Sequence, residues 1–470
     1  MALARLCHDA VRMETSPMKP LLSAIPDYPR SSTWFTAFIV DHKLRANSSD
    51  ESKRVAAELA KLHIDAQILE LDWAALDIDN PRSLTNLESI ARRLRYRAIG
   101  KACASHGIGS LLVAHHARDQ AETVLLRILT EYLGSGLGGM RSCAGIPECR
   151  GIYGVDQSGS GRLITTGGEA MVVEQGGVTI ARPMLSLRKE ELVAFCEESS
   201  VKWFEDPTNA DPTLTMRNTV RSLQEKNTLP VALRADRILA LADNINRRRV
   251  DVERTVDEIY SRTKITLDIR MGEATVRLPE EMQSHSSSVQ ATVLRRLLEL
   301  VSPKDNVAVS QIAQTAEALF NERDAERSAS TRSFQVAGVH IERSNGQLPR
   351  VTLRRATPSA AERETQQITL SFDSAGWSEW HLWDGRWWIR IQPPARLDST
   401  ASIRFLTKED LHAVRRRLDK EDRRLLDKKL ERAKGLQRFT LPAIICNEGS
   451  PQSADGKQVE VVALPSLGWR

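Results

Sequence analysis

The sequence has no apolar run that approaches the roughly 20 residues needed to cross a bilayer, which disfavours a membrane-spanning helix. The first residues, Met1–Arg5, have neither the pattern of a signal peptide nor that of a typical transit peptide. No two cysteines form a Cys-x-x-Cys pair, so neither a zinc ribbon nor a disulfide framework is indicated, and a reducing compartment is expected. The six cysteines are Cys7, Cys103, Cys143, Cys149, Cys196 and Cys446.

Neither positive nor negative charge is in large excess. The 66 Lys and Arg residues are offset by acidic residues, which leaves a net charge of only +5. The basic residues cluster at Arg92-Arg93, Arg247–Arg249 and Arg415–Arg417, which is compatible with nucleic-acid binding but is also typical of solvated helix faces. A length of 470 residues predicts two or three domains. The hydrophobic fraction of 41% and charged fraction of 27% indicate a globular protein.

Helical and strand patterns alternate along the first third of the chain. This alternation predicts a Rossmann-like α/β domain, a parallel sheet with helices on both faces. Ligands of such sheets lie beyond the carboxyl ends of the strands, where Asp41-His42 and His115-His116 stand. After a helix at 1–13, strands are expected at 34–40, 66–71 and 110–114, and helices at 49–62, 86–106 and 120–130.

Three domains are expected from changes in composition. Residues 1–222 would form the α/β domain, with a Gly/Ser-rich insertion or loop at about 145–178. Residues 223–335 are rich in Arg and Leu and predict a helical domain, and residues 336–470 a small α+β domain. Within the last, Trp-rich segments flank Asp384-Gly385, which is a hairpin signal.

The segment from Ala114 to Thr123 carries the strongest chemical signal. It places ionisable residues at a strand end that leads into a helix, whose N-terminus favours anions. Asp119 and Glu122 are three residues apart, so both can face one site and hold a magnesium ion or an amine. The alternative is structural, with Asp119 capping the helix and the histidines completing the strand end.

A second basic segment follows at 203–221. Arg217 and Arg221 are four residues apart and can present one helical face to RNA phosphates. Asp206, Pro207 and Asn209 are better explained as turn residues before that helix.

Five segments occur in the order found in the lysidine synthetases, which belong to the N-type ATP pyrophosphatases, and the chain resembles that family over residues 1–222. The segment His115–Thr123 is similar to the family's His-His-x-x-Asp-Gln-x-Glu-Thr signature. The other four are Val40–Arg45, Asn86–Tyr96, Arg182–Leu185 and Trp203–Arg221, the last with its Asp-Pro-Thr-Asn and Arg-Asn-x-x-Arg strings.

The resemblance implies an ATP-dependent RNA ligase. The family adenylates the C2 oxygen of the wobble cytidine in tRNA(Ile) with anticodon CAU, and L-lysine then displaces AMP. It implies that Arg95, His115, Asp119 and Glu122 act in catalysis, with Asp119 also a Mg²⁺ ligand. It implies nucleotide binding by Asp41, His42, Asn86, Arg92 and His116, and tRNA binding by Arg182, Arg188, Arg217, Asn218 and Arg221. Arg118 occupies a position that is often acidic in the family.

The family's ATP site depends on a Ser-Gly-Gly-x-Asp-Ser loop after the first, central strand, and this string does not occur in the sequence. We therefore expect a reading frame that continues upstream into that strand and loop, and we expect the chain as written to be inactive without the loop. The alternative is a tRNA-binding protein that has lost ATP chemistry. A related tRNA thiolase is disfavoured, because those enzymes usually use paired cysteines. The resemblance further implies a homodimer, located in mitochondria in a eukaryote and in the cytoplasm otherwise.

Overall fold

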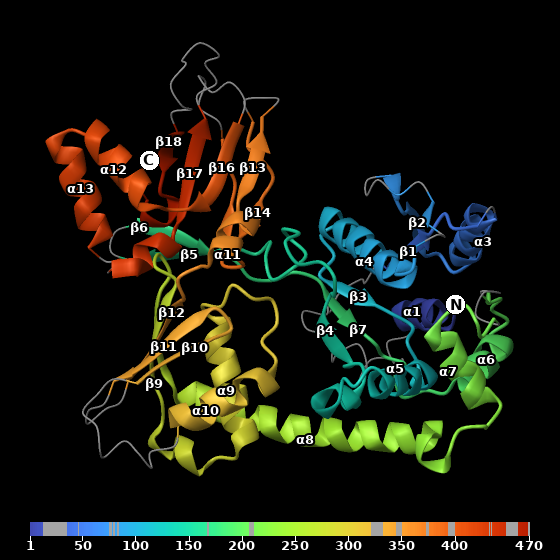
Figure 1. The fold of residues 1–470 in the computed structure, drawn as a ribbon. Helices are drawn as coiled ribbons and strands as arrows, with labels where there is room; N and C mark the ends of the chain where they lie inside the picture. Colours follow the sequence, from blue (N-terminus) through green and yellow to red (C-terminus); the bar gives the residue numbers. More distant parts are fainter. Residues whose placement is uncertain are drawn as a thin grey trace. The chain divides into compact units, whose positions relative to one another are not determined.

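The computed structural model divides the chain into two compact units, residues 1–249 and 250–470, each described here by itself (Figure 1). The described residues are all those outside a set of short segments. These segments are 13–34, 46, 75–77, 79, 82–83, 167–168, 206–210, 321–331, 345–349, 373–375, 393–399, 432, 434, 448–458 and 469–470.

Two small sheets of the N-terminal unit contain parallel strand pairs. In one, β1 (Thr36–Asp41) pairs in parallel with β2 (Asp65–Glu70). In the other, β7 (Thr179–Ala181) pairs in parallel with β3 (Ser110–Leu112) and antiparallel with β4 (Cys143–Gly145). The expectation of one continuous parallel sheet is therefore met only in part: the unit is mixed α/β, and its described strands form separate sheets.

Helices surround these sheets where the sequence patterns predicted them. Tyr96 and Cys103 of α4 are buried in a cluster with Ile180 of β7. Leu6 and Ala10 of the first helix pack beside Ala181. The helices of this unit are α1 (Ala2–Arg12), α3 (Ser48–Lys61), α4 (Leu87–Ser105), α5 (Ala117–Leu129), α6 (Lys189–Glu198) and α7 (Met216–Glu225), and α8 (Ala235–Arg262) begins in it.

The Gly/Ser-rich segment at 145–178 is more ordered than the loop we expected. It contains an antiparallel hairpin of β5 (Arg162–Thr166) and β6 (Glu169–Val173). A bridge between Gly159 and Gly176 extends the pairing. Both of these glycines have φ near +97°, a conformation that side chains with a Cβ rarely adopt. Composition predicted a loop or insertion here, and it did not reveal the two strands.

The C-terminal unit begins with a five-stranded antiparallel sheet of β10 (Arg332–Val336), β11 (Val339–Ser344), β12 (Arg350–Arg355), β9 (Glu273–Arg277) and β8 (Lys264–Asp268). Helices α9 (Ser287–Glu299) and α10 (Val309–Phe320) bury Leu294, Leu297 and Ile312 against it. Strands on both sides of residue 335 pair with one another, so the domain boundary expected there cuts one sheet.

A second, four-stranded sheet follows, together with the hairpin expected around Asp384-Gly385. Its turn has positive φ at Asp384 (49°) and Gly385 (62°), as a two-residue hairpin turn requires. The strands are β13 (Ile368–Ser371), β16 (Thr400–Phe405), β17 (Pro442–Asn447) and β18 (Val459–Ala463), and the hairpin is β14 (His381–Trp383) with β15 (Trp387–Ile389). The helices are α11 (Ala360–Thr365), α12 (Lys408–Arg417) and α13 (Lys420–Leu430).

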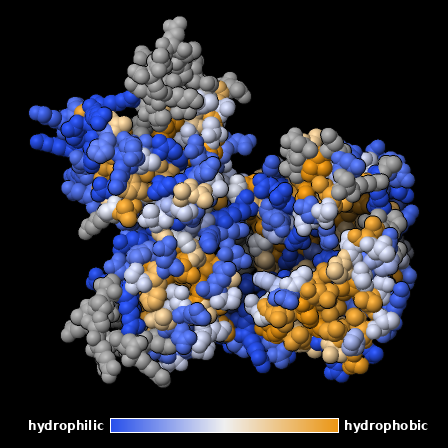
Figure 2. Space-filling view, in the orientation of Figure 1, coloured by the Kyte–Doolittle hydropathy of each residue, from blue (hydrophilic) through white to orange (hydrophobic). Residues whose placement is uncertain are grey.

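Apolar surface is uneven on the N-terminal unit. Figure 2 shows apolar side chains gathered on the face where Figure 1 draws α5. At the end of that helix Leu129, Tyr132 and Leu133 are each nearly 60% exposed, at 58%, 58% and 59%. Among the described residues, no helix combines the length and the apolar character that crossing a membrane requires.

Candidate active site at the start of helix α5

His116 occupies the N-cap position of α5, and Asp119 completes the helix start. The Asp119 Oδ2 atom accepts the backbone N–H of His116 at 3.0 Å and lies 3.2 Å from the His116 Nδ1 atom. The Oδ1 atom of Asp119 has no partner within the described part of the chain. The capping role weighed from the sequence is thus present, and it uses only one oxygen of the carboxylate.

His115 lies half-buried among positive charges. Burial and the positive charges of Arg182, Arg217 and Arg95 lower the pKa of His115 to about 4, although Asp119 opposes the shift. The imidazole is therefore neutral at physiological pH. Its buried Nδ1 atom has no hydrogen-bond partner among the described residues.

The arginines around His115 also have unused donors. Among the described residues, the buried Nε atoms of Arg182 and Arg217 lack acceptors. Arg182 is only 8% exposed, and its Nη1 donates to the carbonyl of Arg141 at 2.8 Å. Burial lowers the pKa of Arg182, while a hydrogen bond with Tyr96 opposes the shift. Buried donors without acceptors are costly, and an anion in this place would satisfy them.

Two cations lie over the ring of Tyr96, which is buried. The guanidinium carbons of Arg92 and Arg95 are 4.8 Å and 5.2 Å from the ring centroid. Arg92 also approaches Glu148, with an Nε–Oε1 distance of 3.4 Å. One aromatic ring thus orients two of the arginines that the family resemblance assigns to the site.

Glu122 is fully buried and engaged by Arg221. The Nε and Nη2 atoms of Arg221 donate to its two carboxylate oxygens at 2.7 Å and 3.0 Å. Hydrogen bonding to Glu122 raises the pKa of Arg221. Arg118 lies 3.7 Å from Glu122 and pairs with Glu225 on α7. Asp119 and Glu122 therefore do not share one open site in this structure, because Glu122 is closed to ligands.

The other expected site residues lie in several environments. Asp41, at the end of β1, is 1% exposed and accepts hydrogen bonds from Ser49 (2.7 Å) and the backbone of Lys43 (3.0 Å). Burial favours its neutral form, but these hydrogen bonds outweigh burial and hold the pKa of Asp41 well below its usual range. The carbonyl of the next residue, His42, accepts the indole N–H of Trp73 at 2.8 Å.

Three further expected site residues lie at or near the starts of helices. Asn86 stands at the N-cap of α4 without a side-chain cap bond. Arg188 occupies the N-cap of α6 and is exposed. Asn218 is buried at 8% exposure and donates to the carbonyl of Asp211 at 2.8 Å, so its side chain stabilises the start of α7. Its expected contact with tRNA stays a prediction.

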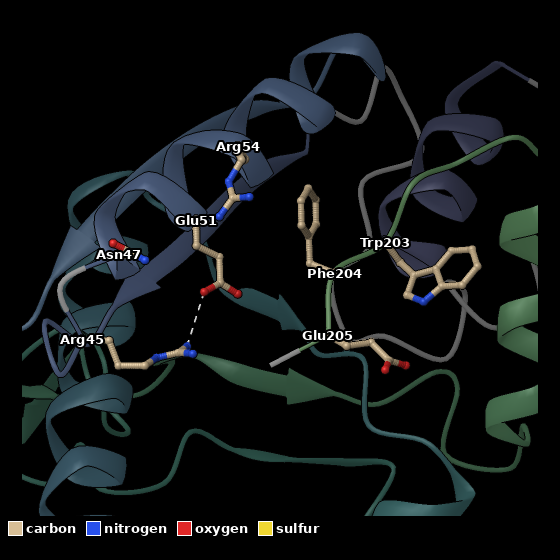
Figure 3. A pocket seen from close by; sticks show the side chains of 7 residues that line it. All are labelled: Arg45, Asn47, Glu51, Arg54, Trp203, Phe204 and Glu205. Atoms are coloured by element: carbon tan, nitrogen blue, oxygen red, sulfur yellow. Dashed lines mark hydrogen bonds and ion pairs between the residues drawn. The ribbon is translucent and has the colours of Figure 1, made fainter. Parts of the chain in front are cut away.

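A cavity of about 440 Å³ lies between α3 and the segment 203–205 (Figure 3). In this view Phe204 projects toward Arg54, and Arg45 is joined to Glu51 by an ion pair of 3.3 Å. The cavity brings together two of the five family-like segments, and the turn residues expected at 206–210 lie outside the described residues. It is lined by Arg45, Asn47, Glu51, Arg54, Trp203, Phe204 and Glu205.

Sequence reasoning missed Asn47, Glu51 and Arg54 as cavity residues. Their spacing on α3, directly after the strand-end segment at 40–45, is the signal that places them on one helical face.

Neither a metal cluster nor a cysteine pair is seen in the described ranges. No three His, Cys, Asp or Glu side chains gather there as a metal site. All six cysteines are free. Five of them are buried, namely Cys7, Cys103, Cys149, Cys196 and Cys446. Burial raises the pKa of Cys103 to about 11 and that of Cys149 to about 12. These thiols are packing groups, unlike reactive thiolates.

Comparison with known proteins supports the resemblance. A PP-loop domain model matches residues 18–226. A probable tRNA(Ile)-lysidine synthase from Schizosaccharomyces pombe is 28% identical over 438 residues, which cover 93% of this chain and 85% of the relative. A tRNA(Ile)-lysidine synthase from Bradyrhizobium diazoefficiens is 31% identical over 183 residues, covering 38% of this chain and 40% of the relative.

A solved U34-tRNA thiolase from Methanococcus maripaludis is 12% identical, with a TM-score of 0.31, over 46% of this chain and 63% of that chain. A likeness this weak supports no conclusion about the fold or the reaction.

Proposed function

From these similarities we propose that the chain is a tRNA(Ile)-lysidine synthase, which joins L-lysine to C2 of the wobble cytidine in tRNA(Ile) with anticodon CAU. The C2 oxygen attacks the α-phosphorus of ATP and diphosphate leaves. The lysine ε-amine then attacks C2, the C2–O bond breaks, and AMP departs with the oxygen. A proton from the amine must pass to a base.

The single observation that carries this proposal is the cluster of Arg95, Arg182 and Arg217 around a neutral His115. Guanidinium groups with unsatisfied donors offset phosphate charge strongly where water is excluded. We assign this cluster to the phosphate that is transferred from ATP. His115, uncharged at neutral pH, can donate a hydrogen bond to the reacting oxygen without adding a further cation.

We assign the lysine amine to Asp119, whose Oδ1 atom has no described partner. A carboxylate binds the ammonium group, and it accepts the proton once the C–N bond forms. Alternatively, the same oxygen would hold Mg²⁺, because it is a hard ligand of the kind that Mg²⁺ prefers, and the ion would neutralise charge on the phosphates of ATP. Mg²⁺ typically takes one or two protein carboxylates, so the single carboxylate of Asp119 is sufficient for this assignment.

Glu122 then acts as a positioning residue. Its bidentate pair with Arg221 fixes the start of α7 against α5, which carries His116 and Asp119. Arg188, which is exposed, and Arg221 are assigned to tRNA phosphates. Nucleotide binding is assigned to the strand-end residues and the start of α4, namely Asp41, His42, Asn86, Arg92 and His116.

The two pairs of parallel strands support a finer proposal for the fold. β1 with β2 and β3 with β7 carry functional residues at their carboxyl ends, as the strands of one Rossmann-like sheet do. We propose that they are parts of such a sheet. Residues 223–335 and 336–470 are assigned to tRNA binding. The exposed side chains of Leu129, Tyr132 and Leu133 support a homodimer. From the proposed substrate we infer a mitochondrial location in a eukaryote and a cytoplasmic location otherwise.

The test is lysine incorporation by the full-length protein. Purified protein, ATP, Mg²⁺, radiolabelled lysine and a tRNA(Ile) transcript with a CAU anticodon should give labelled RNA, and a CAU-to-GAU anticodon change should abolish labelling. Arg217→Ala should lower kcat/KM about 100-fold, because an unpaired phosphate ligand is lost. Arg93→Ala, an exposed arginine on α4, is the matched control and should have no effect.

Labelling that needs no ATP, or Arg217→Ala activity equal to that of Arg93→Ala, would contradict the site assignment. RNA binding without any lysine incorporation would identify the chain as a non-catalytic tRNA-binding protein.

A further inference from the structure

Two tryptophans and an arginine stack on the surface of the C-terminal unit. The guanidinium carbon of Arg390 lies 4.6 Å from the ring centroid of Trp377 and 4.6 Å from that of Trp380. Distances of this size are those of cation–π contacts. The arginine follows β15, and the two tryptophans precede β14, so the hairpin brings the three side chains together.

Backbone hydrogen bonds hold these segments in register. The Ser378 N–H donates to the carbonyl of Ile391 at 2.8 Å, and the Ile391 N–H donates to the Ser378 Oγ atom at 2.9 Å. Ile391 is buried in the core of this sheet. The stack is therefore fixed at its base and does not depend on the rings alone.

Tryptophans of the same hairpin behave differently from Trp377. Trp383 is fully buried and packs on Phe405 with ring centroids 4.6 Å apart. Trp377, in contrast, is 54% exposed. Burying an exposed indole would be favourable by the hydrophobic effect, yet this ring remains on the surface with one side covered by Arg390. The packing of the hairpin core does not account for Trp377.

Arg390 has unused hydrogen-bonding capacity. Its two cation–π contacts engage the faces of the guanidinium, and none of its N–H groups has an acceptor among the described residues. A cation–π contact uses the face of a guanidinium and leaves its in-plane N–H groups available, as in arginines that bind phosphate. Glu379, which is exposed, is the nearest acidic residue in sequence, and it does not pair with Arg390.

We propose that Trp377, Arg390 and Trp380 form a platform that binds one unpaired nucleotide of RNA. The base stacks on the open part of the Trp377 ring, and the Arg390 N–H groups donate to its phosphate. This inference rests on the proposed function, which supplies an RNA substrate. It adds a contact in the C-terminal unit that carries affinity without touching the reacting atoms.

The test compares variants of the full-length chain by their affinity for two RNAs. One is the tRNA(Ile) transcript, and the other is a blunt RNA duplex without unpaired nucleotides. Trp377→Ala should weaken tRNA binding about 5- to 100-fold and leave duplex binding unchanged. Trp377→Phe should restore most of the affinity, because the smaller ring still stacks. Arg390→Ala should weaken binding, whereas Arg162→Ala, at an exposed arginine of β5 to which no tRNA contact is assigned, should not.

Steady-state kinetics provide the second readout. Trp377→Ala should raise the KM for tRNA and leave kcat unchanged, and thermal unfolding should match the wild type. Wild-type tRNA affinity in Trp377→Ala, or an equal loss on the duplex, overturns the platform. If the wild type incorporates no lysine but its tRNA affinity depends on Trp377, the proposed function fails while the platform stands. If the wild type incorporates lysine but Trp377→Ala leaves the KM for tRNA unchanged, the platform fails while the proposed function stands.

Discussion

Each unit of the protein contains one fully buried carboxylate held by two arginines. In the N-terminal unit, Glu122 pairs with Arg221 at 2.7 Å and lies 3.7 Å from Arg118. In the C-terminal unit, Asp384 pairs with Arg355 at 3.2 Å and with Arg386 at 2.7 Å. By residue type and burial the two networks are alike, and a search for buried ion pairs would rank both as candidate sites.

Their surroundings differ. Arg355 also donates to the Gly338 and Ala356 carbonyls and to Glu362, and Arg386 donates to the Thr440 carbonyl, so the Asp384 network joins neighbouring chain segments. Buried nitrogens without a described acceptor occur beside both networks, at His115, Arg182 and Arg217 in one case and at Arg386, Trp383 and Trp387 in the other. Neither a buried ion pair nor an unpaired nitrogen beside it therefore identifies a functional site. The N-terminal network is distinguished by the three positive charges of Arg95, Arg182 and Arg217 that act on His115.

The largest expected effect would sharpen this comparison. Asp384→Asn should lower the free energy of unfolding by about 3–5 kcal/mol, because two buried guanidinium groups lose their counter-charge. Asparagine tolerates the positive φ of 49° at this turn, so backbone strain does not contribute. Urea unfolding measures the change, with Glu379→Gln, an exposed carboxylate on the same segment, as the control. A loss below about 1 kcal/mol would remove the structural role of this network.

Glu122→Gln should have a smaller effect on stability and an added effect on catalysis. We expect a loss of about 2 kcal/mol, because Arg221 retains one acceptor and is partly exposed. Lysine incorporation at saturating tRNA should fall about tenfold as α7 shifts relative to Asp119. Unfolding and kcat are measured on the same preparation. If Glu122→Gln lowers stability but leaves kcat unchanged, the Glu122 network is purely structural, like the Asp384 network, and the difference drawn between them is wrong.

Acid pH should weaken the N-terminal unit through His115. Its pKa is about 4 when folded and about 6.5 when unfolded, so the unfolded chain binds the proton more readily. Stability is therefore full above pH 6.5 and decreases as the pH falls toward 4. The loss should not exceed about 3 kcal/mol, given the partial exposure of the ring. His115→Gln should flatten the difference between pH 7 and pH 4.5 in thermal unfolding. If His115→Gln and the wild type lose the same stability between pH 7 and pH 4.5, protonation of His115 does not cause the loss.

The smallest effect is expected for Arg92→Ala. Its ion pair with Glu148 is exposed, so loss of that pair should cost no more than about 0.5 kcal/mol. The contact with Tyr96 should matter more for the orientation of Arg95, and the KM for ATP should rise less than fivefold. A stability loss above 1 kcal/mol would mean that this surface pair contributes more than its exposure indicates.

Local patterns in the sequence were sufficient for the individual elements. Periodicity placed α4 and α5 to within about three residues at their starts, and the Asp384-Gly385 signal located the hairpin. Strand pairing was harder to predict from the sequence. The paired strands β9 and β12, for example, are separated by more than 70 residues of intervening chain. The separation of the β1–β2 sheet from the β3–β7–β4 sheet depends on such long-range contacts. So does the pairing of strands on both sides of residue 335.

The candidate site shows the same limit. Helical spacing predicted that Asp119 and Glu122 could face one site, but it could not reveal that Arg221, 99 residues away, pairs with Glu122. It also put Arg217 and Arg221 on one face, whereas Arg221 pairs with Glu122 and the buried Arg217 Nε has no acceptor among the described residues. Asn218, expected to contact tRNA, is buried and donates to the Asp211 carbonyl. Motifs identify which residues matter, and tertiary contacts decide which of them remain open to a ligand.

The buried thiols offer a way to follow the two units separately. Cys103 and Cys149 are at most 1% exposed in the N-terminal unit, and Cys446, at 2%, is the sole cysteine of residues 250–470. A thiol reagent reaches such groups only when the chain around them opens. The alkylation rates of these residues therefore measure the opening equilibrium of each unit, with no probe added to the protein.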